Sequence, residues 1–352
     1  MKDRYQDAMD GLHFTQDQKR AMVDGLLEAA NAAPTRHTVR PIRRMALVAA
    51  AAALVLTVGA GASGILPPAS EVFGDLFGGA PAQTQVVDQI GSPIEASATD
   101  NGVTITADAI IGDSYSYAIL YSIRRDDGQP LADPEDLQPM VENYLPLLFT
   151  EWGADVGHLG GTHGSAHFFD ADPSDNAIQY VEMMTADKPI KPGVAKVKFQ
   201  DLRLDTGDGF VTLAEGTWQL KFDFAFENAM VELPVGQDFT LNGMDATLDT
   251  VRISPLSYQV EYTVHSQLQW DHESDGGKQS EHDREQMRKY FDTLPLSIQF
   301  KDGTTLDLDN SGGGISPKGG KTYCEKSALF EEILDLDQVE SITVADITVP
   351  LD

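Results

Sequence analysis

The chain contains a single cysteine, Cys324, among its 352 residues. One thiol cannot form an intramolecular disulfide, and it excludes the zinc sites that are built from pairs of cysteines. We therefore expect Cys324 to be a small, buried residue rather than a metal ligand or a redox centre. The fold has to be stabilised without disulfide cross-links within the chain.

Basic residues are scarce in most of the chain. Residues 67–352 contain 17 Lys and Arg against 49 Asp and Glu, whereas residues 1–44 contain eight against six. A surface this acidic repels phosphate backbones, so we expect no direct binding of nucleic acid. Apolar residues are nevertheless plentiful and fall in short periodic runs, which argues against a disordered acidic tail.

Recognisable catalytic motifs are missing as well. The sequence has no Gly-x-Ser-x-Gly element and no evident nucleophile–base pair. The stretch "GGGISPKGGKT" fails as a phosphate-binding loop because Ile315 stands where that motif requires glycine. We expect a glycine-rich loop there, no enzymatic activity and no cofactor.

Histidines and carboxylates gather in two stretches that lack the fixed spacing of a metal site. The members are His158, His163, His167, Asp170, Asp172 and Asp175 in the first stretch, and Asp271, His272, Glu273, Glu281 and His282 in the second. We interpret both stretches as solvated loops between strands and assign no metal to them.

From Met45 to Leu66 the chain carries no charged residue. A helix of these 22 residues rises about 33 Å, enough to cross a hydrocarbon core of ~30 Å. Four membrane-orienting arginines precede the run: Arg36, Arg40, Arg43 and Arg44. By the positive-inside rule, residues 1–44 are cytoplasmic and the chain after the span is extracytoplasmic. We therefore predict a single-pass protein of the cell membrane.

A cleaved signal peptide is the alternative to a retained span. Ala60-Gly61-Ala62 has the small residues of a cleavage site, and Arg43-Arg44 resembles part of a twin-arginine signal. However, the 44 residues before the apolar run are long for a signal, and the run exceeds a usual signal core. We favour the retained transmembrane helix.

The cytoplasmic residues 1–44 contain a helix signal of their own. Thr15 and Gln18 form a capping box, and apolar residues follow at helical spacing. The predicted partner-binding face consists of Met22, Val23, Leu26, Leu27 and Ala30. A helix this short cannot bury its apolar face alone, so it needs a protein partner or lies on membrane lipid.

Beyond a linker at residues 67–84, the hydrophobic pattern changes to a period of two. Trp218, Leu220 and Phe222 alternate with polar neighbours, as in a half-buried strand. Asp127-Gly128 and Asp302-Gly303 lie between apolar runs and predict hairpin turns. One short helix is expected around residues 281–291.

An internal repeat organises this region. Residues 101–123 align without a gap to residues 242–264, with seven of 23 positions identical and an offset of 141 residues. Each copy has the pattern strand, turn, strand. We predict a mainly β fold with two tandem immunoglobulin-like β-sandwich domains, at residues 85–230 and 231–352.

Two stretches resemble a known group of proteins. "YQDAMDGLHFTQDQKRAMVDGLLEAA", with the basic segment and span after it, resembles the N-termini of single-pass regulatory proteins of Gram-positive bacteria that are regarded as candidate anti-sigma factors. "IEASATDNGVTITADAIIGDSYSYAILYSI" resembles the extracytoplasmic β-domain of unknown function that such proteins carry. The resemblance implies a cytoplasmic sigma factor as partner, although the zinc-type motif His-x3-Cys-x2-Cys is absent.

We therefore expect a membrane-anchored regulatory protein. Its extracytoplasmic β-region would bind a ligand whose identity the sequence leaves open, and its cytoplasmic helix would bind a sigma factor. The alternative is a surface-anchored ligand-binding or adhesion module without a cytoplasmic client.

Overall fold

The computed structural model describes residues 69–77, 81–139, 144–157, 159–271, 274–275, 278–308 and 311–351. The predicted cytoplasmic segment and transmembrane helix lie outside these ranges. The same holds for every residue of the predicted partner-binding face and for the four membrane-orienting arginines. Within the described ranges, no helix has both the length and the apolar character that a membrane crossing requires.

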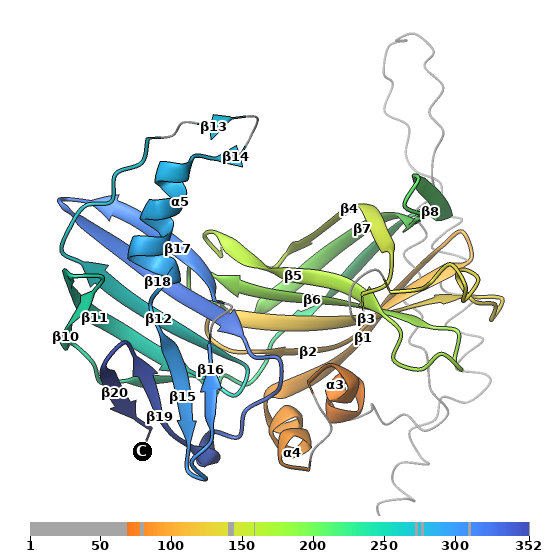
Figure 1. Cartoon of the computed structure of the whole chain (residues 1–352). Helices are drawn as coiled ribbons and strands as arrows, with labels where there is room; N and C mark the ends of the chain where they lie inside the picture. The colour runs from red at the N-terminus through yellow and green to blue at the C-terminus, as the bar shows by residue number, and fades with distance from the viewer. Residues whose placement is uncertain are drawn as a thin grey trace, which may run out of the picture. The chain divides into compact units, whose positions relative to one another are not determined.

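The chain is mainly β and contains several antiparallel sheets (Figure 1). The strands before residue 225 make up what we call the first β-unit. They are β1 (Gly91–Asp100), β2 (Val103–Gly112), β3 (Ser116–Arg125), β4 (Leu147–Asp155), β5 (Thr162–Phe169), β6 (Ile178–Ala186), β7 (Gly193–Asp205) and β8 (Phe210–Phe224). They form a five-stranded sheet in the order β1-β2-β3-β6-β5 and a three-stranded sheet in the order β4-β7-β8.

The remaining elements make up the second β-unit. They are β9 (Val231–Leu233), β10 (Asp238–Leu241), β11 (Met244–Ile253), β12 (Ser257–Val264), β13 (Ser274–Asp275), β14 (Lys278–Gln279), α5 (Glu281–Met287), η1 (Arg288–Asp292), β15 (Leu296–Phe300), β16 (Thr305–Asp307), β17 (Gly312–Lys318), β18 (Lys321–Leu329), η2 (Leu336–Gln338), β19 (Val339–Val344) and β20 (Ile347–Pro350). The larger sheet has the order β10-β11-β12-β18-β17 with β9 beside β11, and the smaller has the order β16-β15-β19-β20.

The internal repeat corresponds to the same strands in both β-units. Adding the offset of 141 residues to the bounds of β2 gives the bounds of β11, and the start of β3 gives the start of β12. The order of the larger sheets is also the same, with β5 and β6 in the positions of β17 and β18. The repeat therefore describes a shared topology and not merely a shared hairpin.

Two local devices in the repeat explain why both copies fold alike. Asn101-Gly102 has φ values of 47° and 75°, and the equivalent Asn242-Gly243 has 50° and 77°, which suits a tight hairpin turn. In each copy the first strand then bulges at an aspartate, Asp108 or Asp249, whose carboxylate accepts a 2.6 Å hydrogen bond from a hydroxyl on the next strand. Turn and bulge together fix the register.

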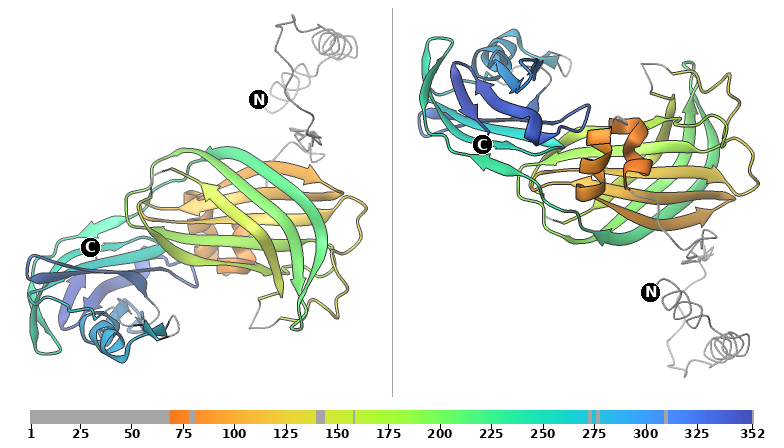
Figure 2. Two further views of the ribbon diagram at one scale, coloured as in Figure 1. Left: turned by 90° about the horizontal axis from the view of Figure 1, so that it is seen from above. Right: turned by 90° about the horizontal axis from the view of Figure 1, so that it is seen from below.

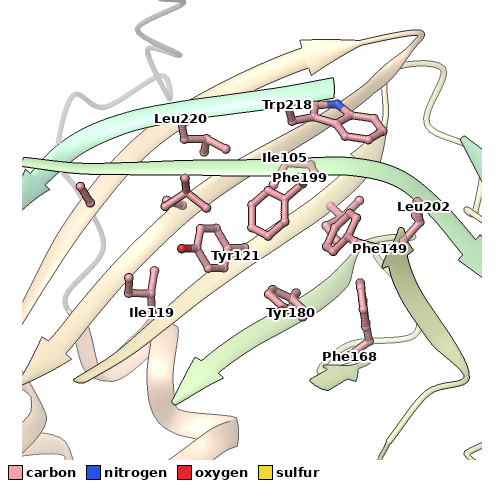
Figure 3. Close-up of a cluster of buried hydrophobic side chains, with 14 of the residues drawn as sticks. Ile105, Ile119, Tyr121, Phe149, Phe168, Tyr180, Phe199, Leu202, Trp218 and Leu220 are labelled. Atoms are coloured by element: carbon pink, nitrogen blue, oxygen red, sulfur yellow. The ribbon is translucent and has the colours of Figure 1, made fainter. Parts of the chain in front are cut away.

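The core of the first β-unit is aromatic (Figure 3). Phe149, Tyr121 and Tyr180 pack around Phe199, with ring centroids 4.5 to 5.7 Å from it. The predicted alternation along β8 is confirmed, since Trp218, Leu220, Phe222 and Phe224 are all buried. Trp218 also donates from Nε1 to the carbonyl oxygen of Val103 at 2.9 Å, which joins the two sheets.

Two helices occupy the region where we expected a linker. α3 (Ala69–Phe77) and α4 (Pro81–Ile90) lie across the outer face of the five-stranded sheet (Figure 2, right). Ala69, Phe73 and Phe77, four residues apart, are each 3% exposed or less. The spacing of four is a helical stripe that the neighbouring glycines and prolines obscured. Gly91 permits the close packing, because a Cβ there would lie 2.6 Å from the Cβ of Ala69.

The predicted turns, the short helix and the buried cysteine are confirmed except for one turn. Asp302-Gly303 does join paired strands, β15 and β16, and residues 281–292 are helical as expected. Asp127-Gly128 ends β3 but leads into irregular chain rather than a partner strand, so the hairpin predicted there is wrong. Cys324 is buried, as predicted, and burial raises the pKa of its thiol to about 12.

Candidate ligand-binding cleft

A cleft of about 1210 Å³ lies against the outer face of the five-stranded sheet, the face turned away from the aromatic core. α3 and α4 cover this face over β2 and β3, where Ala109, Ile111 and Leu120 meet Phe73 and Phe77 in one buried cluster. Val181 of β6 belongs to the same cluster, whereas β5 and the Met183–Thr185 end of β6 face the cleft. These residues form the floor of the cleft.

The floor owes its composition to the alternation along β5. Phe168 points into the core, so His163, Ser165, His167 and Phe169 point the other way, and all four line the cleft. We expected these histidines in a solvated loop, which is wrong, because residues 162–169 form a strand. His158, from the same stretch, lies outside the described residues.

Three further segments provide the walls. The last residues of α3, Leu76 and Phe77, line one side. The proline-rich stretch 130–139 lines another, and the end of β18 with Phe330 contributes a third from the second β-unit. The cleft is thus built from parts of the chain that are up to about 250 residues apart in sequence.

The cleft is acidic rather than basic. Among the described residues that line it there is no lysine or arginine, whereas Asp170 and Glu331 contribute carboxylates. Burial, with Asp175 nearby, raises the pKa of Asp170. Burial also lowers the pKa of His167, so its imidazole is neutral at pH 7.

One end of the floor is polar and incompletely hydrogen-bonded. The ring of His167 stacks on Tyr144 with centroids 4.0 Å apart. Nδ1 of His167 and Oδ1 of Asp170 are both buried without a hydrogen-bond partner in the described part of the chain. A buried polar atom left unpaired costs about 1–3 kcal/mol, so this end is less well satisfied than an ordinary sheet surface.

β5 also offers a free backbone edge. It is the terminal strand of its sheet, and no other described strand pairs with its outer side. The carbonyl of Phe168 points to that side, since it accepts a hydrogen bond of 2.9 Å from the amide of Leu145. Residues 162, 164 and 166 have the same parity and therefore present their backbone groups outward.

The two β-units touch through equivalent turns. Asp113, in the turn between β2 and β3, accepts hydrogen bonds from the hydroxyls of Ser254 (2.5 Å) and Ser257 (2.7 Å), which flank the turn between β11 and β12. Asp113 and Ser254 are themselves equivalent in the repeat, being 141 residues apart. Burial raises the pKa of Asp113, and the surrounding donors oppose that change.

Each β-unit buries an ionisable group at the same sheet position. Glu182 pairs with Ile119, and Lys326 pairs with the equivalent Val260. Glu182 accepts a 2.7 Å bond from Tyr117, and burial raises its pKa to about 7. Lys326 instead donates to the carbonyl of Phe291 in η1 at 3.1 Å.

The second stretch of histidines and carboxylates is not the loop we expected where it is described near its end, because Glu281 and His282 lie in α5, while His272 and Glu273 lie outside the described residues. His282 lies 2.8 Å from the carbonyl of Gln269, and Ser280 caps α5 by accepting from the amide of Asp283. The glycine-rich stretch predicted as a loop forms β17 and its turn into β18. Across the described residues, no group of three or more histidine, cysteine or acidic side chains is arranged to hold a metal ion.

No local sequence pattern predicted the cleft. The predicted site residues lie outside the described ranges, and the stretch "THGSAHFF", which we interpreted as a loop, is the strand that forms the floor. Period-two alternation of His163, Ser165, His167 and Phe169 was the available signal. The walls come from segments remote in sequence, which no local pattern brings together.

Comparison with known proteins gives limited similarity. A family model described as a domain of unknown function (DUF4179) matches residues 40–125. A solved structure described as the conserved domain protein from Bacillus anthracis is 16% identical, with 72% of this chain and 75% of that chain covered and a TM-score of 0.46. A comparison with curated proteins gives no match.

Proposed function

We propose that the chain is a membrane-anchored regulatory protein, an anti-sigma factor whose extracytoplasmic region binds a ligand in the cleft. In this account the two β-units are tandem immunoglobulin-like β-sandwich domains at residues 85–230 and 231–352. They lie outside the cell, and residues 1–44 lie in the cytoplasm. The protein is a binding and signalling device and not an enzyme, and its role uses no cofactor.

The position of α3 is the observation that carries this proposal. The predicted span ends at Leu66, and α3 begins at Ala69. Eight residues later, Phe77 lines the cleft and its carbonyl accepts a bond of 3.4 Å from the amide of Ile333 in the second β-unit. A ligand in the cleft would therefore contact a helix that follows directly from the span.

The cytoplasmic end of the proposal rests on the amphipathic stripe at Met22, Val23, Leu26, Leu27 and Ala30. These residues would bind the sigma factor while Arg36, Arg40, Arg43 and Arg44 hold the orientation of the span. If a ligand displaced α3, the transmembrane helix that precedes it would move as well. That movement would change whether the apolar stripe is free to bind the sigma factor.

A pull-down tests this function. The full-length chain in nanodiscs serves as bait in cytosol from its native cell, beside the double variant Met22→Asp/Leu26→Asp as control. A sigma factor recovered with the native chain and lost with the variant supports the proposal. Recovery of no protein, or equal recovery with both baits, contradicts it.

The alternative is a surface-anchored ligand-binding or adhesion module. It is favoured by one observation: every described wall of the cleft belongs to the region after the predicted span, so binding needs nothing from residues 1–44. Replacing residues 1–34 with an unrelated polar sequence separates the two functions. The adhesion module keeps its cellular effect after that exchange, whereas the regulator loses it.

A further inference from the structure

We infer that the cleft binds an extended, cationic and apolar peptide segment, which pairs along the free edge of β5. This inference deepens the proposed function, on which it rests for the cleft being the ligand site. Four features of the described residues carry it: size, apolar contact, charge and a free backbone edge.

The size of the cleft suits a chain segment rather than a metabolite. Small-molecule pockets usually measure about 300–1,000 Å³. At about 1210 Å³ this cleft is larger, and it is walled by three separate parts of the chain. An extended segment of several residues can contact all of them at once.

The lining favours apolar side chains in that segment. Leu131 and Leu137 of the proline-rich wall face the same space as Phe169 and Met183 of the floor and Phe330 of the far wall. Burying apolar groups against them contributes roughly 25 cal/mol for each Å² removed from water. A strongly polar oligomer, such as a sugar chain, would make few apolar contacts with these side chains.

The charge of the lining favours a cationic ligand. The lining has two carboxylates, Asp170 and Glu331, and no lysine or arginine among its described members. The exposed carboxylates Asp133, Glu135 and Asp136 flank the lining residue Pro134 along the chain. Such a site repels phosphate and other anionic groups and attracts ammonium and guanidinium groups.

The edge of β5 supplies main-chain recognition. Outward amides and carbonyls at residues 162, 164 and 166 can hydrogen-bond an added strand, as in other cases of β-strand addition. The floor side chains of the same strand would then meet alternate side chains of the bound peptide. Main-chain hydrogen bonds along the edge of β5 would provide affinity. The acidic and apolar side chains around it would select for cationic and apolar residues in the peptide.

The test is a binding titration on the full-length chain in phosphatidylcholine nanodiscs, with empty nanodiscs subtracted. The probe is a fluorescein-labelled octapeptide of alternating lysine and phenylalanine. Two comparison peptides replace every lysine by glutamate or every phenylalanine by serine. We expect saturable anisotropy changes with the lysine–phenylalanine peptide and at least about tenfold weaker binding of both comparison peptides.

A matched pair of variants locates the binding. Ser165→Arg places a cation on the exposed floor, and Gln219→Arg places the same group on an exposed position of β8. We expect Kd to rise about tenfold or more for Ser165→Arg and to change less than about twofold for Gln219→Arg. Thermal melting of both variants checks that the fold is retained.

Several results would overturn the inference. They are equal binding of the glutamate peptide, no binding of the lysine–phenylalanine peptide, or equal effects of the two arginine variants. A change of oligomeric state in Ser165→Arg without a change in peptide binding would assign the cleft to a second copy of the chain instead. The sigma-factor pull-down is read independently, so the peptide inference can fail while the proposed function stands.

Discussion

The larger sheets of the two β-units have the same strand order, but the outer face of the first is apolar and that of the second is polar and charged. At equivalent positions the first β-unit has Ala109, Ile111, Ala118, Leu120 and Val181, and the second has Thr250, Arg252, Gln259, Glu261 and Glu325. Helices α3 and α4 cover the first face, whereas Arg252 on the second bonds to Glu232 and Glu261. The topology is therefore set by the inward positions, and the outward positions are free to specify what docks there.

The buried ionisable groups of the two β-units, Glu182 and Lys326, also have different surroundings. Around Lys326 in the second β-unit, η1 provides carbonyl acceptors, and Tyr262 also donates to one of them, that of Tyr290, at 2.7 Å. Around Glu182 in the first, the hydroxyls of Tyr121 and Tyr180 have no partner within the described chain. One unit satisfies its polar core groups by an inserted helix, and the other surrounds them with aromatic rings.

Exchange of outer-face residues should have the largest effect. Leu120→Glu places the residue of the second unit beneath α3, where an unpaired charge costs roughly 3–5 kcal/mol. The reverse change, Glu261→Leu, should alter the free energy of unfolding by no more than about 1 kcal/mol, since the Glu261 side chain is 37% exposed. Urea unfolding of both variants measures the difference. Equal effects would show that the faces are not distinguished by the covering helices.

Glu182 should give the first β-unit an unusual pH dependence. Burial raises its pKa from 4.5 to about 7, so the folded state holds a proton that the unfolded state has released between these values. The contribution of Glu182 to the free energy of unfolding is therefore fully present below pH 4.5. It falls by about 3 kcal/mol as the pH rises to about 7.

The matched variants for this prediction are Glu182→Gln and Glu261→Gln. The first should abolish most of the fall in stability between pH 4.5 and 7, and the second, on the partly exposed face of the other unit, should keep it. Melting temperatures across the pH series check the result. An unchanged slope in Glu182→Gln would mean that another group titrates.

The junction of the units should respond more modestly. Ser254→Ala removes a hydroxyl that donates to Asp113 and accepts from the amides of Leu256 and Ser257, so we expect a loss of about 2 kcal/mol. Ser257→Ala removes only the donor to Asp113 and should cost about 1 kcal/mol. Unfolding midpoints test the order, and a reversed order would contradict the hydrogen bonding described.

The smallest effect is expected for the ion contacts on the outer face of the second β-unit. Arg252→Ile introduces the residue of the first unit and removes ion contacts to Glu232 and Glu261, whose side chains are 63% and 37% exposed, at a cost of about 1 kcal/mol. Because salt screens these two exposed carboxylates, that cost should shrink further in 1 M salt. A large, salt-independent loss would show that the network is structural rather than a solvated surface.

Local patterns predicted the β-rich fold and the repeat, and they failed where packing partners are distant. The alternation along β8 and the Asp302-Gly303 turn each depend on residues adjacent in sequence, so a single sequence is enough to predict them. Helix α3 depends on an apolar sheet face that is assembled from β2, β3 and β6. The cleft depends on what that helix leaves uncovered, and no window of sequence contains this information.

Hydrogen exchange of the full-length chain in nanodiscs tests the central claim most directly, namely that the cleft on the outer face of the five-stranded sheet is a ligand site coupled to α3. Exchange is measured with and without the lysine–phenylalanine octapeptide. The account predicts changed protection in β5 and in α3 (Ala69–Phe77), with none in β10 (Asp238–Leu241) on the second unit. Protection that changes in β5 but not in α3 would contradict the coupling, and no change in either would contradict the site.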